Sequence, residues 1–341
     1  MKTKAIKLIK NGDSKNAFSV EEIELEEPKK DEVQIEVESF GINYADVMAR
    51  NGLYREAPPL PCVLGYEVVG KVTKVGADTP EILLNKRVVA FTRFGGYSKT
   101  VNTKFQGVAV IDDYDGGKAL CLATQYVTAF YMSHVVTTVQ KGDNVLIHAA
   151  AGGVGTALIQ LLKDKGATIY AKTGSDKKID YLKSQGVDHV INYNKEDYTS
   201  QLILLLKEQR INISFNPVAG STFKKDWRLL GNGGSLVLFG GSERSGKKWG
   251  IFSTLNFVRK MGIIIPITLM MRSKSVMGVN MLKVADYKPF TIQHCLEQVV
   301  KKAIAGDLQP QVGASYKANE IAEAHAFLES GKSTGKIVLH W

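Results

Sequence analysis

Cysteine is scarce in this chain: Cys62, Cys121 and Cys295 are the three among 341 residues, and no two form a Cys-x-x-Cys pair. So few and so distant thiols exclude a disulfide framework and a four-cysteine zinc site, and they favour a reducing compartment, which we expect to be the cytoplasm. The N-terminal residues MKTKAIK meet charge again before any apolar run develops, so we expect no signal peptide.

Long apolar runs are also scarce. The longest, Met261–Met271, reads MGIIIPITLMM, contains Pro266 and is preceded by Trp249 and Phe252. Eleven residues are too few to cross a hydrocarbon core that needs about 20. We expect this segment to be packed as a wall of a substrate cleft or as an interface between protomers; a peripheral membrane contact is the less favoured alternative.

Histidines show no ligand spacing. The six histidines are scattered along the chain and suggest neither a metal site nor a catalytic dyad: His134, His148, His189, His294, His325 and His340.

Charge is unbalanced, with 44 Lys+Arg against 34 Asp+Glu and a net charge of +10. The basic residues are dispersed, which suits a solvated surface and an anionic small-molecule cofactor, with no obligate nucleic acid; nucleic acid and acidic membranes remain alternatives.

The most informative stretch is the glycine-rich run His148–Gly155. It follows a short apolar segment and opens an amphipathic one, Thr156–Lys165. Ala150, Gly152 and Gly155 have the spacing of a dinucleotide fingerprint, in which the small residues allow a tight turn, close approach to a pyrophosphate and close packing of helix on strand. The helix N-terminus would then hold the anion. Alanine at the first position departs from the usual glycine, and a tight turn without a ligand is the alternative.

The pattern of predicted secondary structure changes near residue 120. Before it, short strands separated by Gly and Pro predict a barrel-like β domain, and Val33, Ile35 and Val37 alternate with polar residues as in a half-buried strand. After it, strands alternate with helices, which predicts a parallel doubly wound sheet. The fold class is therefore α/β. The tail, residues 311–341, is expected to pack back onto the first domain.

Several segments carry a family resemblance across nearly the whole chain: Gly41–Asp46, Asn51–Tyr54, Leu64–Gly70, Gly142–Asp143, the glycine loop with Gln160 and Lys163, and Gly335–Leu339. They resemble the quinone oxidoreductase and zeta-crystallin group of the medium-chain dehydrogenase/reductase superfamily, and Ser214–Val279 looks most like the branch of the synaptic vesicle amine-transport protein homologue. The resemblance implies a GroES-like catalytic domain, residues 1–120 and 282–341, a Rossmann NAD(P)-binding domain, residues 121–281, and a homodimer.

Two departures from the zinc-dependent relatives matter most. Those relatives have a cysteine at the position of Asn43 and a histidine at that of Tyr66, and neither amide nor phenol is a good zinc ligand. We therefore predict no catalytic zinc; Asp46 and Glu67 flank the lost zinc position and would only orient the polar groups there. A third departure is Asn216, near a strand end where relatives often carry aspartates.

Without a catalytic metal, fewer classes of hydride acceptor are suitable as substrates. Oxidation of a plain alcohol usually needs a Lewis acid, whereas a quinone or an α,β-unsaturated carbonyl accepts hydride and spreads the resulting charge. Neutral donors suffice for that anion, and the resemblance places Asn43, Tyr54 and Tyr66 as the catalytic candidates. The alternatives are that Asn43 only holds a loop and that both tyrosines are packed aromatics.

NADPH is the predicted cofactor. The segment Lys172–Lys178 has no carboxylate at the strand end but a hydroxyl and lysines, which suit a 2′-phosphate. The resemblance assigns Ser175 and Lys178 to that phosphate and Tyr193 to the adenosine, while Asp176 should cap the next helix; a solvated helix start is the alternative. The predicted cofactor-binding set is Thr128, Ala150, Gly152, Gly153, Val154, Gly174, Ser175, Lys178, Tyr193, Phe239, Gly240, Gly241, Val279, Asn280 and Lys336.

Three functions compete. The leading hypothesis is a zinc-independent, NADPH-dependent reductase of quinones or enones, with a small-molecule acceptor as its partner. The second is a zinc-free alcohol or aldehyde reductase. The third is a dinucleotide-binding protein with little turnover that associates with a membrane or nucleic acid.

Overall fold

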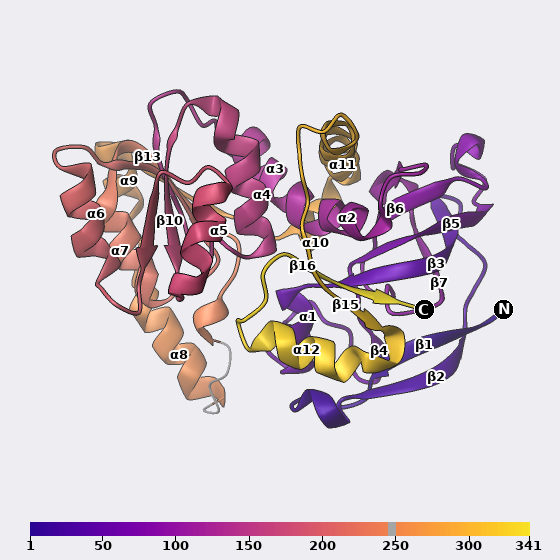
Figure 1. Ribbon diagram of the computed structural model, residues 1–341. Coiled ribbons are helices and arrows are strands. Elements are labelled where there is room, and N and C mark those ends of the chain that lie inside the picture. Colours follow the sequence, from indigo (N-terminus) through magenta and orange to yellow (C-terminus); the bar gives the residue numbers. More distant parts are fainter. Residues whose placement is uncertain (245–249) are drawn as a thin grey trace. The chain divides into compact units, whose positions relative to one another are not determined.

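The protein is described by a computed structural model that covers residues 1–244 and 250–341; Trp249 and the side chain of Phe252 lie outside the described part. The chain forms two compact units, Met1–Thr128 with Met281–Trp341, and Ala129–Asn280 (Figure 1). The boundaries expected from the sequence are 120/121 and 281/282.

Two sheets build the first unit. A small antiparallel sheet has the order β2-β1-β4, and a larger one runs β15-β16-β3-β5-β6-β8, with β7 also pairing with β3. The strands are β1 Lys2–Leu8, β2 Phe18–Glu24, β3 Glu32–Ile42, β4 Cys62–Val63, β5 Glu67–Val75, β6 Arg87–Phe91, β7 Thr100–Lys104, β8 Val108–Val110, β15 Val312–Lys317 and β16 Lys336–His340.

The alternation in β3 is confirmed for its apolar residues. Val33, Ile35 and Val37 are buried in the core between the sheets, as a period of two requires. Gln34, expected to face solvent, is buried instead, because its amide donates to Asn102 on β7 at 3.2 Å. The tail returns as predicted: β16 pairs antiparallel with β3, with Ile337 opposite Ile42.

Six helices accompany these strands in the described residues. They are α1 Tyr44–Arg50, α2 Gly116–Cys121, α3 Val127–Phe130 (which crosses the unit boundary), α10 Met281–Tyr287, α11 Pro289–Ile304 and α12 Ile321–Glu329. Two π-helical turns, Leu122–Tyr126 and Tyr131–Val136, flank α3.

The second unit contains a six-stranded sheet in the order β11-β10-β9-β12-β13-β14. Every neighbouring pair is parallel. The predicted α/β class with a parallel doubly wound sheet is thus confirmed. The strands are β9 Asn144–Ile147, β10 Thr168–Thr173, β11 His189–Asn192, β12 Ile211–Asn216, β13 Leu230–Leu238 and β14 Ser275–Gly278.

Helices cover both faces of this sheet, with α4 and α5 on one side and α6 and α7 on the other (Figure 1). The described helices of this unit are α4 Gly153–Leu162, α5 Ile179–Ser184, α6 Tyr198–Leu206, α7 Ser221–Leu229, α8 Gly250–Met261 and α9 Pro266–Arg272. The chain builds β9, β10 and β11 outward in one direction, then crosses to β12 on the other side of β9. Ligands of such sheets bind where the order reverses, beyond the carboxyl end of β9.

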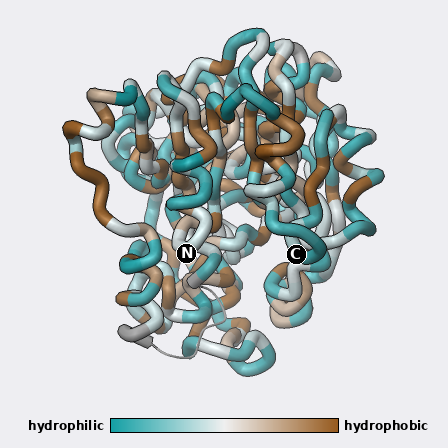
Figure 2. The backbone as a smooth tube through the Cα atoms, turned by 90° about the vertical axis from the view of Figure 1, so that its left-hand side faces the viewer, coloured by the Kyte–Doolittle hydropathy of each residue, from teal (hydrophilic) through white to brown (hydrophobic). Residues whose placement is uncertain are grey.

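The apolar segment Met261–Met271 is largely exposed on its own unit, so whether it lines a cleft or an interface stays a prediction. Ile263 is 93% exposed, and Met270 and Met271 are largely exposed as well. Gly262 takes a positive φ of 78° and Pro266 starts α9, so the helix is interrupted between α8 and α9. By length and composition alone, one stretch of the described residues, Ser253–Arg272, could cross a membrane. Figure 2 shows hydrophobic segments at the outside of the fold as well as inside it.

Candidate active site

The glycine loop lies at the carboxyl end of β9, next to the reversal of strand order. The backbone N–H of Ala150 donates to Lys172 O at 3.2 Å and that of Gly152 to Ala149 O at 2.9 Å, which closes the turn. Ala149 has a positive φ of 49°. By helix geometry the first N–H groups of α4, from Gly153 and Val154 onward, have no acceptor within the helix. They form a ready anion site.

Two glycines of the loop meet different surroundings. A Cβ added at Gly155 would come within 2.5 Å of Ala150 O, so α4 can pack this closely on the loop only without a side chain there. This is the packing role that the sequence predicted for Gly155. A Cβ at Gly152 would meet only Ala149 O, at 3.2 Å. The open side of Gly152 therefore leaves room for a phosphate, and the loop fits a dinucleotide.

The carboxyl end of β10 lies next to the glycine loop at the same edge of the parallel sheet. Tyr193, half exposed after β11, donates its N–H to Thr173 O at 3.1 Å. A Cβ at Gly174 would lie 2.7 Å from the Tyr193 hydroxyl, so the ring covers the turn closely. Ser175 begins the 3₁₀ turn Asp176–Lys178. Burial lowers the pKa of Lys178, which is half-buried at this edge.

Asp176 does not cap a helix, so that prediction is wrong. Its carboxylate accepts from the Asn192 amide at 2.7 Å and pairs with Lys195 at 2.5 Å, and these hydrogen bonds, the one from Lys195 foremost, lower its pKa. The reason is tertiary: parallel pairing of β10 and β11 brings the end of β11 beside this turn. Asp176, the carboxylate within the segment Lys172–Lys178, is therefore already paired with a cation.

The remaining predicted cofactor residues of this unit follow β13 and β14. The N–H of Phe239 donates to Asn216 O at 3.3 Å, and that of Val279 to Leu238 O at 2.8 Å. A Cβ at Gly240 would lie 2.7 Å from Pro217 O, and one at Gly241 would touch the Phe257 ring. Because all the strands are parallel, Phe239–Gly241 and Val279–Asn280 lie at the same sheet edge as the glycine loop.

Beneath this edge is a buried charged network that sequence reasoning missed. Asp226 on α7 accepts from the Tyr198 hydroxyl and the Ser214 hydroxyl, both at 2.8 Å, and from the Asn216 amide at 2.7 Å. His148 Nε2 lies 2.7 Å from the same carboxylate. Burial alone would raise the pKa of Asp226, but these neighbours, His148 foremost, hold it below its usual range. We call these residues, together with Lys172, the Asp226 network.

Lys172 completes the Asp226 network. Its ammonium lies 3.2 Å from His148 Nδ1 and 3.3 Å from the centroid of the Tyr198 ring. Donation from the ammonium to Nδ1 assigns the proton of a neutral His148 to Nε2, which faces Asp226. Burial lowers the pKa of Lys172 to about 7 and lowers that of His148 as well. Lys172 therefore points into the protein rather than toward a 2′-phosphate.

A second buried polar cluster lies in the first unit, where β3, β5 and β16 meet. The Asn43 amide donates to Glu67 Oε1 at 2.8 Å, and its oxygen accepts from Lys336 Nζ at 2.9 Å. Lys336 also forms an ion pair with Glu67. Asp46 accepts from the N–H of Asn43 at 2.8 Å and from that of Gly65 at 3.1 Å. We call Asn43, Asp46, Glu67 and Lys336 the Lys336 cluster.

Burial dominates the electrostatics of the Lys336 cluster. Glu67, Asp46 and Lys336 have no exposed surface. Burial raises the pKa of Asp46 to about 7, although the two backbone donors and Lys336 oppose that shift. Within the described residues, Glu67 Oε2 has no hydrogen-bond partner. A buried carboxylate oxygen without a partner costs free energy, so this position is suited to accept a donor from a ligand or water.

The two predicted tyrosines lie together. The rings of Tyr54 and Tyr66 meet edge to face at 6.3 Å, and Phe94 packs on Tyr66 at 5.2 Å. Both are packed aromatics, but the buried Tyr66 hydroxyl has no hydrogen-bond partner in the part of the chain that is described. Burial raises the pKa of Tyr66 well above its usual value and that of Tyr54 to about 12. The phenols therefore stay protonated and able to donate.

The structure brings some of the predicted site residues together and places others elsewhere. Asn43 and Tyr66 lie close to Asp46 and Glu67, which the sequence marked only as flanking residues. Lys336, predicted at the cofactor, is in the Lys336 cluster, and its signal was the charged residue that opens an otherwise apolar strand. Thr128 is buried in α3. The described residues contain no group of three or more His, Cys, Asp or Glu arranged to hold a metal ion.

Two family models match the chain and together span most of it. Residues 29–131 match the alcohol dehydrogenase GroES-like domain, and residues 153–297 match the zinc-binding dehydrogenase family. The human synaptic vesicle membrane protein VAT-1 homolog is 27% identical over 92% of this chain and 79% of its own length. A phenolphthiocerol/phthiocerol polyketide synthase protein of Mycobacterium tuberculosis is 26% identical over 95% of this chain, which spans only 14% of that protein.

A solved structure agrees with these relatives. The quinone oxidoreductase of Escherichia coli, determined with NADPH, superimposes with a TM-score of 0.86 at 25% identity and covers 99% of this chain and 100% of its own. The two family models together span most of the chain and place it in the medium-chain dehydrogenase/reductase superfamily, and quinone oxidoreductases and VAT-1 proteins are among the proteins it is similar to.

Proposed function

We propose that the protein transfers hydride from NADPH to a quinone or an α,β-unsaturated carbonyl without a catalytic zinc ion. The observation that carries this proposal is the ion pair between Lys336 and Glu67, next to Asn43 and Tyr66, where zinc-dependent relatives have their ligands. An ammonium already neutralises the carboxylate, and a nearby Zn²⁺ would be repelled by it. The other groups there, the Asn43 amide and the Tyr66 phenol, are poor zinc ligands.

The cofactor would be held along the carboxyl edge of the Rossmann sheet. The N–H groups at Gly153 and Val154 suit the pyrophosphate, and the open side of Gly152 allows close approach. Ser175 and Lys178 would bind the 2′-phosphate, because Asp176 is paired with Lys195 and offers little repulsion. The reduced nicotinamide supplies the hydride when bound.

The Lys336 cluster and the neighbouring Tyr66 would supply the polar groups for the reaction. Tyr66 has a protonated hydroxyl with a raised pKa and no protein partner among the described residues. It can donate to an oxyanion that develops on a quinone or enone oxygen, while the Lys336 charge, held by Glu67, adds electrostatic stabilisation. Tyr66 or water would deliver the proton.

Steady-state turnover tests the proposal. Purified protein should oxidise NADPH with members of a panel of ortho- and para-quinones and enones, and treatment with a chelator should leave the rate unchanged. The Lys178→Gln variant should raise the KM for NADPH about tenfold and leave the KM for NADH unchanged, because one phosphate contact is lost. Chelator-sensitive oxidation of alcohols, or bound stoichiometric zinc, would contradict the proposal.

A further inference from the structure

A cationic pocket of about 780 Å³ opens in the Rossmann unit, away from the glycine loop. Its lining includes Arg210, which precedes β12, and Arg228, in the last turn of α7. Arg272 and Lys274 extend the lining just before β14. These residues lie at the amino ends of parallel strands, whereas the dinucleotide fingerprint lies at the carboxyl ends. These four cations therefore lie away from the cofactor edge.

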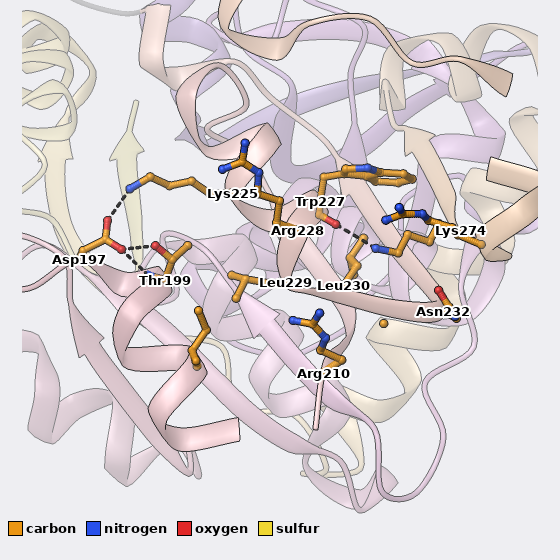
Figure 3. A pocket seen from close by; sticks show the side chains of 13 residues that line it. Asp197, Thr199, Arg210, Lys225, Trp227, Arg228, Leu229, Leu230, Asn232 and Lys274 are labelled. Carbon is orange, nitrogen blue, oxygen red and sulfur yellow. Dashed lines mark hydrogen bonds and ion pairs between the residues drawn. The ribbon is translucent and has the colours of Figure 1, made fainter. Parts of the chain in front are cut away.

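The positive charges of this pocket are not balanced. Asp197, the acidic residue of the lining, is paired with Lys225 at 2.5 Å and also caps α6 (Figure 3). No ion pair involves Arg210, Arg228 or Arg272 among the described residues. Cations in the last turn of α7 and α9 complement the helix dipole, which accounts in part for Arg228 and Arg272.

The helix dipole does not account for Lys274, which is only 7% exposed. Its ammonium donates to Trp227 O at 3.1 Å and lies 4.9 Å from the centroid of the Trp227 ring (Figure 3). An ammonium has three donors, and within the described residues no carboxylate pairs with this one. Burial, with repulsion from Arg272 and Arg210, lowers its pKa. A buried cation facing other cations is costly unless an anion joins it.

We propose that this pocket binds a phosphate group through Lys274, Arg210 and Arg272. Guanidinium forks match phosphate oxygens in paired hydrogen bonds, and the fixed ammonium of Lys274 adds a point charge. The phosphate has two possible carriers, a soluble phosphate compound or a lipid headgroup. The second is raised by Ile267, Met270 and Met271, which are exposed on α9 immediately before Arg272.

Calorimetric titration of the full-length protein with inorganic pyrophosphate tests the site, with and without saturating NADPH so that binding at the glycine loop is accounted for. The variants Lys274→Met and Arg210→Gln/Arg272→Gln should each weaken binding at least about tenfold, since each removes charged hydrogen-bond donors. The matched control Lys71→Gln/Lys99→Gln removes two exposed charges from the other unit and should bind like the wild type.

Sedimentation with phosphatidylcholine vesicles, with or without phosphatidic acid, distinguishes the two carriers. Binding to the acidic vesicles that is lost in Arg210→Gln/Arg272→Gln and in Met270→Ser/Met271→Ser supports the lipid. Pyrophosphate binding that depends on the cations, without vesicle binding, supports a soluble ligand. Binding in neither arm, or an equal loss in the control pair, overturns the proposal. Circular dichroism melting confirms that each variant is folded, and Lys274→Met should melt no lower than the wild type.

Discussion

Each unit of this protein buries a lysine beside a carboxylate, and the two clusters differ in how completely the oxygens of Asp226 and Glu67 are paired. In the Asp226 network, both carboxylate oxygens are used: Tyr198 donates to one, and Ser214 and Asn216 donate to the other. In the Lys336 cluster, Glu67 uses one oxygen and leaves the other without a partner among the described residues. A carboxylate with both oxygens paired stabilises the fold, whereas one with a free oxygen can still bind a ligand.

The largest effect on stability is expected from removing Asp226, the carboxylate at the centre of the Asp226 network. Asp226→Ala would leave the Tyr198 hydroxyl without its acceptor and the buried His148 and Lys172 without their nearby negative charge. We expect the free energy of unfolding to fall by about 3–5 kcal/mol, because a buried charge loses its counterion. Urea denaturation followed by circular dichroism measures this, and a loss below about 1 kcal/mol would show that the network is not structural.

Two tyrosine variants, one beside each cluster, test whether the Asp226 network is structural and the Lys336 cluster catalytic. Tyr66→Phe removes a hydroxyl with no protein partner, so stability should change by less than about 0.5 kcal/mol while kcat falls about 100-fold. Tyr198→Phe removes a donor to Asp226 and should cost about 1–3 kcal/mol of stability with kcat within about twofold of the wild type. Denaturation and turnover of both variants, side by side, provide the check. The reverse pattern would exchange the roles of the two clusters.

The clusters should also respond to pH in opposite directions. The pKa of Asp46 is raised from 3.8 to about 7, so the folded protein binds more protons between these values, and stability from this group is lost as pH rises through that window. The pKa of Lys172 is lowered from 10.5 to about 7, so the folded protein binds fewer protons there, and stability rises with pH between about 7 and 10.5.

Differences between variant and wild type isolate these two contributions. Asp46→Asn should flatten the fall in stability below pH 7, and Lys172→Met should flatten the rise above it. Denaturation midpoints across the pH range measure both slopes. Parallel curves for wild type and either variant would contradict the corresponding pKa shift.

The smallest effect is expected at the exposed pair of Asp176 and Lys195, which no burial strengthens. Lys195→Gln should leave the free energy of unfolding almost unchanged, since exposed ion pairs contribute little. It frees the Asp176 carboxylate, so it should slightly weaken NADPH binding and leave NADH binding unchanged. Fluorescence titration of both cofactors detects this, and equal weakening of both would separate Asp176 from the 2′-phosphate.

The features that could be predicted depended on local pattern. The alternation of strands and helices and the spacing of Ala150, Gly152 and Gly155 specified the parallel sheet and its loop, because period and backbone sterics act over a few residues. The pairing of Asp176 with Lys195 and the burial of Gln34 and Lys172 could not be read in this way. Each depends on which neighbouring strand lies alongside.

The linear order of residues by itself determined the class of fold, the glycine loop and the absence of cysteine and histidine at the positions of zinc ligands. Only the tertiary structure decided that Lys336, 293 residues from Asn43, neutralises Glu67, and that Arg210, Arg228, Arg272 and Lys274 gather around a pocket at the amino edge of the sheet. The physical reason is that charges interact through space: their energies depend on distance and on burial, neither of which a sequence separation reveals.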